Sequence, residues 1–140
     1  MSVESPPVVN GGASNGTCIS CKVQLPLVSH INGKLFGRPN AGVDMTFDFA
    51  QLIAYVTRTR RLGAGAVIGS GTVSNYDRSS GSSCLAETRA LEQIAGGKPT
   101  TPFLRFGDRV RIEMFGRDGA SLFGAIDQQV IAAQARFTRD

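Results

Sequence analysis

At its centre the chain reads Gly65-Ala66-Val67-Ile68-Gly69-Ser70-Gly71-Thr72-Val73-Ser74-Asn75, a short apolar run followed by spaced glycines and polar residues. The β-branched Val67 and Ile68 suit a covered, pleated surface, so the run is typical of a buried strand end. Gly71 lets the chain bend or a ligand approach the backbone, and Thr72 adds a hydroxyl and a backbone N–H. We expect either a turn that holds a carboxylate or carbonyl oxygen, or a glycine-rich turn without a ligand.

The composition predicts one domain rich in β structure. The chain has 140 residues, of which 41% are hydrophobic and 19% charged, as is usual for soluble globular proteins. Its 17 glycines favour turn-rich β structure over a helical bundle. No apolar run approaches the length of a membrane span, and no secretion signal opens the sequence. We therefore expect a cytoplasmic protein without a membrane partner.

The net charge of +4 raises the question of an anionic partner, either nucleic acid or an acidic metabolite. Arg58, Arg60 and Arg61 form the one dense basic cluster, at the end of a predicted helix. Cations at that position complement the helix dipole, and aromatic residues do not interleave with them as in a single-strand-binding surface. We therefore expect no nucleic-acid partner.

Local patterns predict the first elements. Residues 1–21 are rich in Ser, Gly, Pro and Asn and predict an irregular lead-in, so the domain proper is expected over residues 22–140. Strands are expected over residues 22–31 and 34–38, joined by the turn dipeptide Asn32-Gly33. Pro26 indicates that the first strand is an edge strand or is bulged there.

A helix is expected over residues 46–61, capped by Thr46 and with Asp48 in its first turn. Its apolar residues recur at helical spacing and form one face: Phe49, Leu52, Ile53 and Val56. Gly63 is a plausible stop signal. This amphipathic helix is expected to pack on the β structure.

The rest of the chain predicts a short strand over residues 84–87, a brief helix over 88–95 closed by two glycines, and a terminal hairpin. The hairpin joins residues 109–115 and 121–130 through Asp118-Gly119. In its first strand the residues expected to face inward are Val110, Ile112 and Met114. The sequence thus predicts a mainly β, α+β domain with one packed amphipathic helix.

The sequence gives little indication of a metal site or of redox chemistry. Cys18 and Cys21 have the spacing of a redox pair or half a zinc site, but no second paired knuckle accompanies them. The acidic residues do not form the compact set of oxygen ligands that a hard divalent cation needs. We therefore assign no metal ligand in this chain.

Four segments, taken in order, resemble the fumarylacetoacetate hydrolase family. They are residues 38–47 (RPNAGVDMTF), 69–74 (GSGTVS), 81–87 (GSSCLAE) and 106–113 (FGDRVRIE). The first leads into the predicted helix, and the likeness as a whole covers about residues 22–130. The resemblance implies the C-terminal part of the family's catalytic domain, a mixed β-roll that is usually dimeric.

The resemblance also implies a function. Family members act on carbon–carbon bonds beside a carbonyl with Mg²⁺ or Ca²⁺, and the founding reaction hydrolyses fumarylacetoacetate in the breakdown of tyrosine and related aromatic compounds. By similarity, Gly71 and Thr72 bind a small dicarboxylic oxo acid. Glu87 is the implied catalytic residue, which orients a histidine base that activates water.

The chain departs from the family pattern in one respect. The family's metal ligands and catalytic histidine precede the segments matched here, and the single histidine, His30, falls on a predicted strand. We therefore expect the C-terminal portion of a homodimeric hydrolase that is inactive as an isolated chain. The alternatives are a decarboxylase, isomerase or hydratase of small 2-oxo acids on the same fold, or a non-catalytic assembly fragment.

Overall fold

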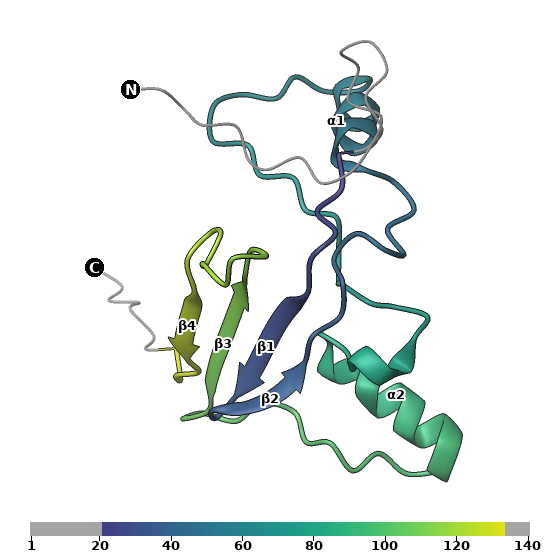
Figure 1. Ribbon diagram of the computed structural model, residues 1–140, viewed down its shortest axis with the longest axis vertical. Coiled ribbons are helices and arrows are strands. Elements are labelled where there is room, and N and C mark those ends of the chain that lie inside the picture. Colours follow the sequence, from purple (N-terminus) through teal and green to yellow (C-terminus); the bar gives the residue numbers. More distant parts are fainter. Residues whose placement is uncertain (1–20, 134–140) are drawn as a thin grey trace, which may run out of the picture.

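A computed structural model describes residues 21–133 and shows a four-stranded sheet with two helices (Figure 1). The elements in chain order are β1 (Leu27–Ile31), β2 (Lys34–Gly37), α1 (Phe49–Thr57), the 3-10 turn η1 (Arg78–Ser80), α2 (Leu85–Gly96), β3 (Arg109–Met114) and β4 (Ile126–Gln129). The predicted mainly β, α+β class is confirmed. Residues 1–20 of the expected lead-in, Cys18 among them, lie outside the described residues.

The sheet has the order β2-β1-β3-β4, and every neighbouring pair is antiparallel. Asn32 and Gly33 join β1 to β2 with φ values of 51° and 76°, the positive angles that the Asn-Gly dipeptide predicts. The expectation that Pro26 marks an edge or a bulge is wrong. β1 is an interior strand that begins after Pro26, and its irregular register falls between Ser29 and His30.

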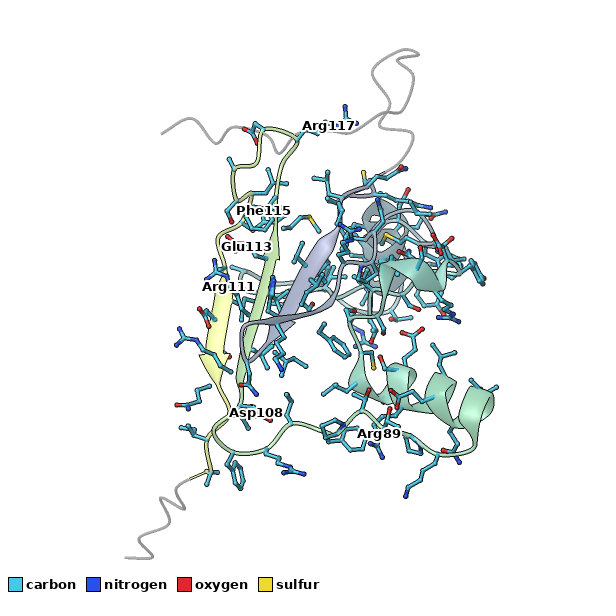
Figure 2. The ribbon with its side chains drawn as sticks, turned by 60° about the horizontal axis from the view of Figure 1, so that its bottom comes forward. Arg89, Asp108, Arg111, Glu113, Phe115 and Arg117 are labelled. Atoms are coloured by element: carbon cyan, nitrogen blue, oxygen red, sulfur yellow. The ribbon has the colours of Figure 1, made fainter. Side chains whose placement is uncertain are left out.

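The two faces of β3 differ as its alternating sequence predicts. Met114 is the buried hydrophobic residue on this strand, and Val110 and Ile112 are half-buried. On the other face Arg109 and Arg111 both bind the carboxylate of Asp127 on β4. Figure 2 shows Arg111 and Glu113 near each other on that side of the strand. One face of β3 therefore carries apolar side chains, and the other face carries charged side chains.

α1 begins later than expected because Asp48, not Thr46, caps it. The Asp48 carboxylate accepts the backbone N–H of Gln51, and the Gln51 side chain accepts that of Asp48. The predicted apolar face is partly covered at Phe49, Leu52 and Val56. In Figure 1, α1 lies beyond one end of the sheet and α2 lies beside the β2 edge. Neither described helix has the length and hydropathy to cross a bilayer.

Two predicted strands are absent from the described residues. Residues 65–72 form no strand, and Val67 is 94% exposed, because no neighbouring strand pairs with this apolar run or covers it. Residues 84–87 begin a helix instead: Cys84 is the N-cap of α2, and Glu87 lies in its first turn. The predicted stop at two glycines is correct, since Gly97 ends α2 in the left-handed conformation with φ 75°.

Candidate functional site

Glu87 lies in the first turn of α2, and three side chains donate to its carboxylate. Ser74 Oγ and Arg78 Nη1 both donate to Oε1, over 2.5 and 2.7 Å. Ser82 Oγ donates to Oε2 over 2.7 Å. We call Ser74, Arg78 and Ser82 the carboxylate cradle. Because a carboxylate offers about four acceptor directions, the cradle leaves room for one more donor, on Oε2.

The cradle holds Glu87 in its ionised form. The hydroxyl of Ser74, then that of Ser82, and more weakly the Arg78 guanidinium lower the pKa of the Glu87 carboxyl below its usual range, against partial burial. A carboxyl group with a lowered pKa is an anion at neutral pH. Glu87 is therefore suited to accept a hydrogen bond and to stabilise a neighbouring cation, rather than to donate a proton.

The end of β2 positions the Ser82 arm of the cradle. Gly37 pairs with Gly81 through an isolated bridge, and Arg38 donates its backbone N–H to Ser80 over 2.9 Å. Ser82 is buried directly against Gly37, where an added Cβ would lie 2.2 Å from the Ser82 carbonyl oxygen. The sheet thus fixes the residues that lead into α2.

Asn75 positions the Ser74 arm. Its side chain is buried. The side-chain amide accepts a hydrogen bond from the backbone N–H of Asn40 and donates one to the Asn40 carbonyl. Ser83 adds a second link, since its hydroxyl donates to the Val73 carbonyl over 2.6 Å. These bonds hold residues 73–75 between the segment around Asn40 and the start of α2.

The short turn η1 positions Arg78. Asp77 caps this turn by accepting the backbone N–H of Ser79 over 2.9 Å and its hydroxyl over 3.0 Å. The Ser79 bonds keep the Asp77 pKa below its usual value. Arg78 follows the cap directly, and its guanidinium reaches Glu87 across the turn. A charged side chain on an exposed loop is thereby held in one place.

The predicted binding residues Gly71 and Thr72 lie in the loop before Ser74, and both are exposed. Gly71 has φ 95°, which favours glycine, and no described atom lies within 4 Å of an added Cβ. Glycine is therefore favoured at this position by the backbone conformation of the turn, and not by a close contact with the described residues. Thr72 makes no hydrogen bond to Glu87, and Ser74 is the link between this loop and the carboxylate.

Two adjoining hollows share Asp44, Thr72 and Ser74 in their linings. The larger, of about 280 Å³, is also lined by Asn75, Tyr76 and Arg78. The second, of about 240 Å³, extends from Thr72 towards Leu52 on α1. Thr72 therefore lines the same hollow as the cradle residues Ser74 and Arg78. Both of these side chains donate to Glu87, so they connect the predicted binding loop to the predicted catalytic glutamate.

Several other acidic side chains among the described residues cap helices or accept hydrogen bonds from nearby groups. Asp48 and Asp77 cap α1 and η1. The Asp108 carboxylate accepts hydrogen bonds from the Asn32 side-chain amide and from the backbone N–H of Arg105. These hydrogen bonds lower the pKa of Asp108. Asp44 accepts the backbone N–H of Tyr76 over 3.0 Å.

Within residues 21–133 no group of three or more His, Cys, Asp and Glu side chains could hold a metal ion. The described residues thus do not fit the divalent ion that the resemblance implies. His30 does not complete a metal or base site either, because it lies in β1 opposite Leu35 and Arg111. The Cys18–Cys21 spacing stays a prediction, since Cys18 is not described.

The sequence did not identify the cradle. Ser74 and Ser82 are present in the quoted segments without an assigned role, and no role is assigned to Asn75 or Arg78 from the sequence. One local signal was available: Glu87 follows Cys84 by three positions, the spacing of an acidic residue in the first turn after an N-cap. The convergence of the three donors depends on long-range contacts and has no local signature.

Comparison with known proteins adds a family to this geometry. Residues 5–131 match the family described as fumarylacetoacetate (FAA) hydrolase C-terminal. The match includes Gly71, Thr72, Glu87 and the whole cradle. No curated protein shows a significant match to the chain.

Proposed function

The chain belongs to the fumarylacetoacetate hydrolase family, and from this premise we propose that it provides the base-orienting and substrate-binding part of a hydrolase. The proposed substrate is fumarylacetoacetate or a related 1,3-dicarbonyl acid, and the bond cleaved is the carbon–carbon bond between the two carbonyl groups. The observation that carries the proposal is the three-donor cradle of Glu87 next to the hollow lined by Thr72.

The proposed reaction needs a base that takes a proton from water. The water oxygen adds to one carbonyl carbon, the adjoining carbon–carbon bond breaks, and its electron pair leaves as an enolate that is then protonated. A histidine next to Glu87 suits this task, because an anionic carboxylate orients the neutral ring and stabilises it once it is protonated. The open acceptor direction on Oε2 of Glu87 supports such a partner.

We propose that this imidazole comes from outside the chain. The sequence has a single histidine, His30, which is fixed in β1 between β2 and β3. The Mg²⁺ or Ca²⁺ of the proposed enzyme would likewise need ligands beyond residues 21–133, where no suitable cluster occurs. The isolated chain is therefore expected to turn over little substrate.

The exposed apolar surface supports the proposal that further polypeptide packs on this chain. Large hydrophobic side chains are open to solvent, among them Phe106 (73% exposed), Phe123 (68%) and Ile131 (73%). Apolar surface of this extent is typical of interaction sites. We propose that another part of the enzyme, or a second copy in a homodimer, packs on it.

The test is turnover of 2,4-dioxopentanoate and of fumarylacetoacetate with Mg²⁺ or Ca²⁺, by the chain alone and by the natural protein that contains it. Loss of the enol absorbance and formation of pyruvate and acetate report cleavage of 2,4-dioxopentanoate. We expect turnover by the protein that supplies the histidine and the metal ligands, and little by the chain alone. If the natural protein cleaves neither compound with either metal, the proposed hydrolase activity is wrong.

A further inference from the structure

Arg78 has hydrogen-bonding capacity that the cradle does not use. Of the five N–H groups of its guanidinium, one at Nη1 donates to Glu87. Within residues 21–133 the other four donate to no acceptor in the protein, and the side chain is 54% exposed. An arginine that only fixed Glu87 would need one of these donors. The remaining edge of the fork is free to bind a second anion.

Arg78 lines the hollow of about 280 Å³ that Thr72 also lines. Among the described residues that line this hollow, Arg78 is the cation and Asp44 is the one carboxylate. The other lining side chains are uncharged: Thr72, Ser74, Asn75 and Tyr76. The hollow thus offers a bidentate anion binder at Arg78 and a hydroxyl with a backbone N–H at Thr72.

We propose that Arg78 is the residue that recognises the carboxylate of the substrate, while Thr72 takes a carbonyl oxygen of the same molecule. This proposal rests on the proposed function and makes it more specific, because it assigns the carboxylate of the oxo acid to one named side chain. The planar guanidinium fork matches a carboxylate in two parallel hydrogen bonds, a geometry that a lysine does not reproduce.

Asp44 restricts how such a substrate binds. Asp44 lines the same hollow, and its carboxylate accepts the backbone N–H of Tyr76. A substrate carboxylate placed near Asp44 would be repelled, whereas one at Arg78 gains a charge-assisted contact. The two charges therefore favour one orientation of an oxo acid, with its anionic end at Arg78.

The competing explanation is that Arg78 acts only through Glu87. In that case removal of the Arg78 guanidinium weakens the binding of an acid and of the corresponding neutral ester to the same extent, because neither ligand touches the guanidinium. If Arg78 binds the carboxylate, only the acid loses affinity. The ratio of the two affinities therefore separates direct recognition from positioning.

The experiment uses the ¹⁵N-labelled chain, titrated with 2-oxopentanoate and with methyl 2-oxopentanoate. Neither probe has a 1,3-dicarbonyl group, so the proposed reaction cannot consume them. The variants are Arg78→Met, Arg78→Lys, Glu87→Gln and the control Arg117→Met, whose arginine lies in the turn between β3 and β4 (Figure 2). The dispersion of the amide spectrum shows that each variant is folded.

For the wild type we expect the acid to bind about tenfold or more tightly than the ester, with shifts at Thr72 and Arg78. Arg78→Met should bring this ratio close to one, and Arg78→Lys should restore part of it. Arg117→Met and Glu87→Gln should keep the preference for the acid. An unchanged ratio in Arg78→Met, or no saturable binding of the acid to the wild type, would overturn the proposal.

These outcomes are independent of turnover. If the ratio depends on Arg78 but the natural protein cleaves no 1,3-dicarbonyl acid, carboxylate recognition stands and the hydrolase proposal fails. If the protein cleaves such acids and the Arg78→Met ratio is unchanged, the hydrolase proposal stands and the carboxylate is recognised elsewhere.

Discussion

Asn40 and Asn75 are joined by hydrogen bonds in both directions: the Asn40 N–H donates to Asn75 Oδ1 over 2.7 Å, and Asn75 Nδ2 donates to the Asn40 carbonyl over 3.0 Å. The two residues are 35 positions apart, so this pair joins two loops that form no strand or helix with each other. Because Asn75 directly follows Ser74, the pair also sets where one arm of the carboxylate cradle lies.

Substitution of Asn75 should lower the stability of the chain. Asn75→Ala leaves the backbone N–H and carbonyl of Asn40 without their partners, and an unsatisfied buried polar group costs about 1–3 kcal/mol. Urea denaturation should show a loss of that size. The matched control is Gln93→Ala on the exposed face of α2, which should change stability little. Equal stability of the two variants would contradict the role given to Asn75.

Gly37→Ala should be strongly destabilising, because a Cβ at this position would lie 2.2 Å from the Ser82 carbonyl oxygen and 2.8 Å from the Ser82 nitrogen. The backbone has to move to relieve this contact, and overpacking of this kind typically costs about 1–3 kcal/mol. Gly96→Ala is the control, since nothing lies within 4 Å of its added Cβ and alanine favours helix. Thermal denaturation should show opposite changes in Tm for the two variants.

Local sequence signals predicted the elements that depend on local geometry. The Asn32-Gly33 turn needs positive φ at both residues, and the alternation in β3 follows from the two-residue period of a strand. The Gly97 stop of α2 needs only the left-handed conformation that glycine adopts readily. Each of these features is specified by a few adjacent residues.

The features that the sequence did not predict depend on distant partners. The apolar run around Val67 predicted a buried strand, but burial requires another segment to cover it, and none of the described residues does. The cradle requires Ser74, Arg78 and Ser82 to meet Glu87, and that meeting is set by the contacts of Asn75 and Gly37. No spacing along the chain encodes these contacts, although the family resemblance identified Glu87 as a candidate.

The Glu92 carboxylate should titrate at low pH. It accepts the backbone N–H groups of Thr100 and Thr101 and the Thr101 hydroxyl, and the Thr101 bonds chiefly lower its pKa from 4.5 to about 2. Since the folded pKa lies below the unfolded one, the contribution to stability is complete above pH 4.5. It is lost as the pH falls towards about 2.

The measurement for Glu92 is the amide shift of Thr101 as a function of pH. We expect a midpoint at about 2 in the wild type and no such titration in Glu92→Gln. The nearby contact of Arg89 over the Phe103 ring, at 4.4 Å to the centroid, should persist in that variant and serves as the control for the rest of this loop. A Thr101 midpoint near the ordinary glutamate value of 4.5 would show that these hydrogen bonds do not form in solution.

Glu87→Gln should abolish most of the proposed activity while leaving the fold in place. Glutamine keeps the shape of the side chain and one acceptor oxygen, but it cannot stabilise a protonated base by charge. Loss of such a partner lowers kcat about a hundredfold or more, with little change in KM, since Glu87 is not proposed to bind the substrate. The enzyme proposed above should be assayed with 2,4-dioxopentanoate, with Glu113→Gln on β3 as the control carboxylate away from the cradle. A Glu87→Gln protein as active as the wild type would rule out the role of this carboxylate in orienting a base, whatever the remaining cradle residues do.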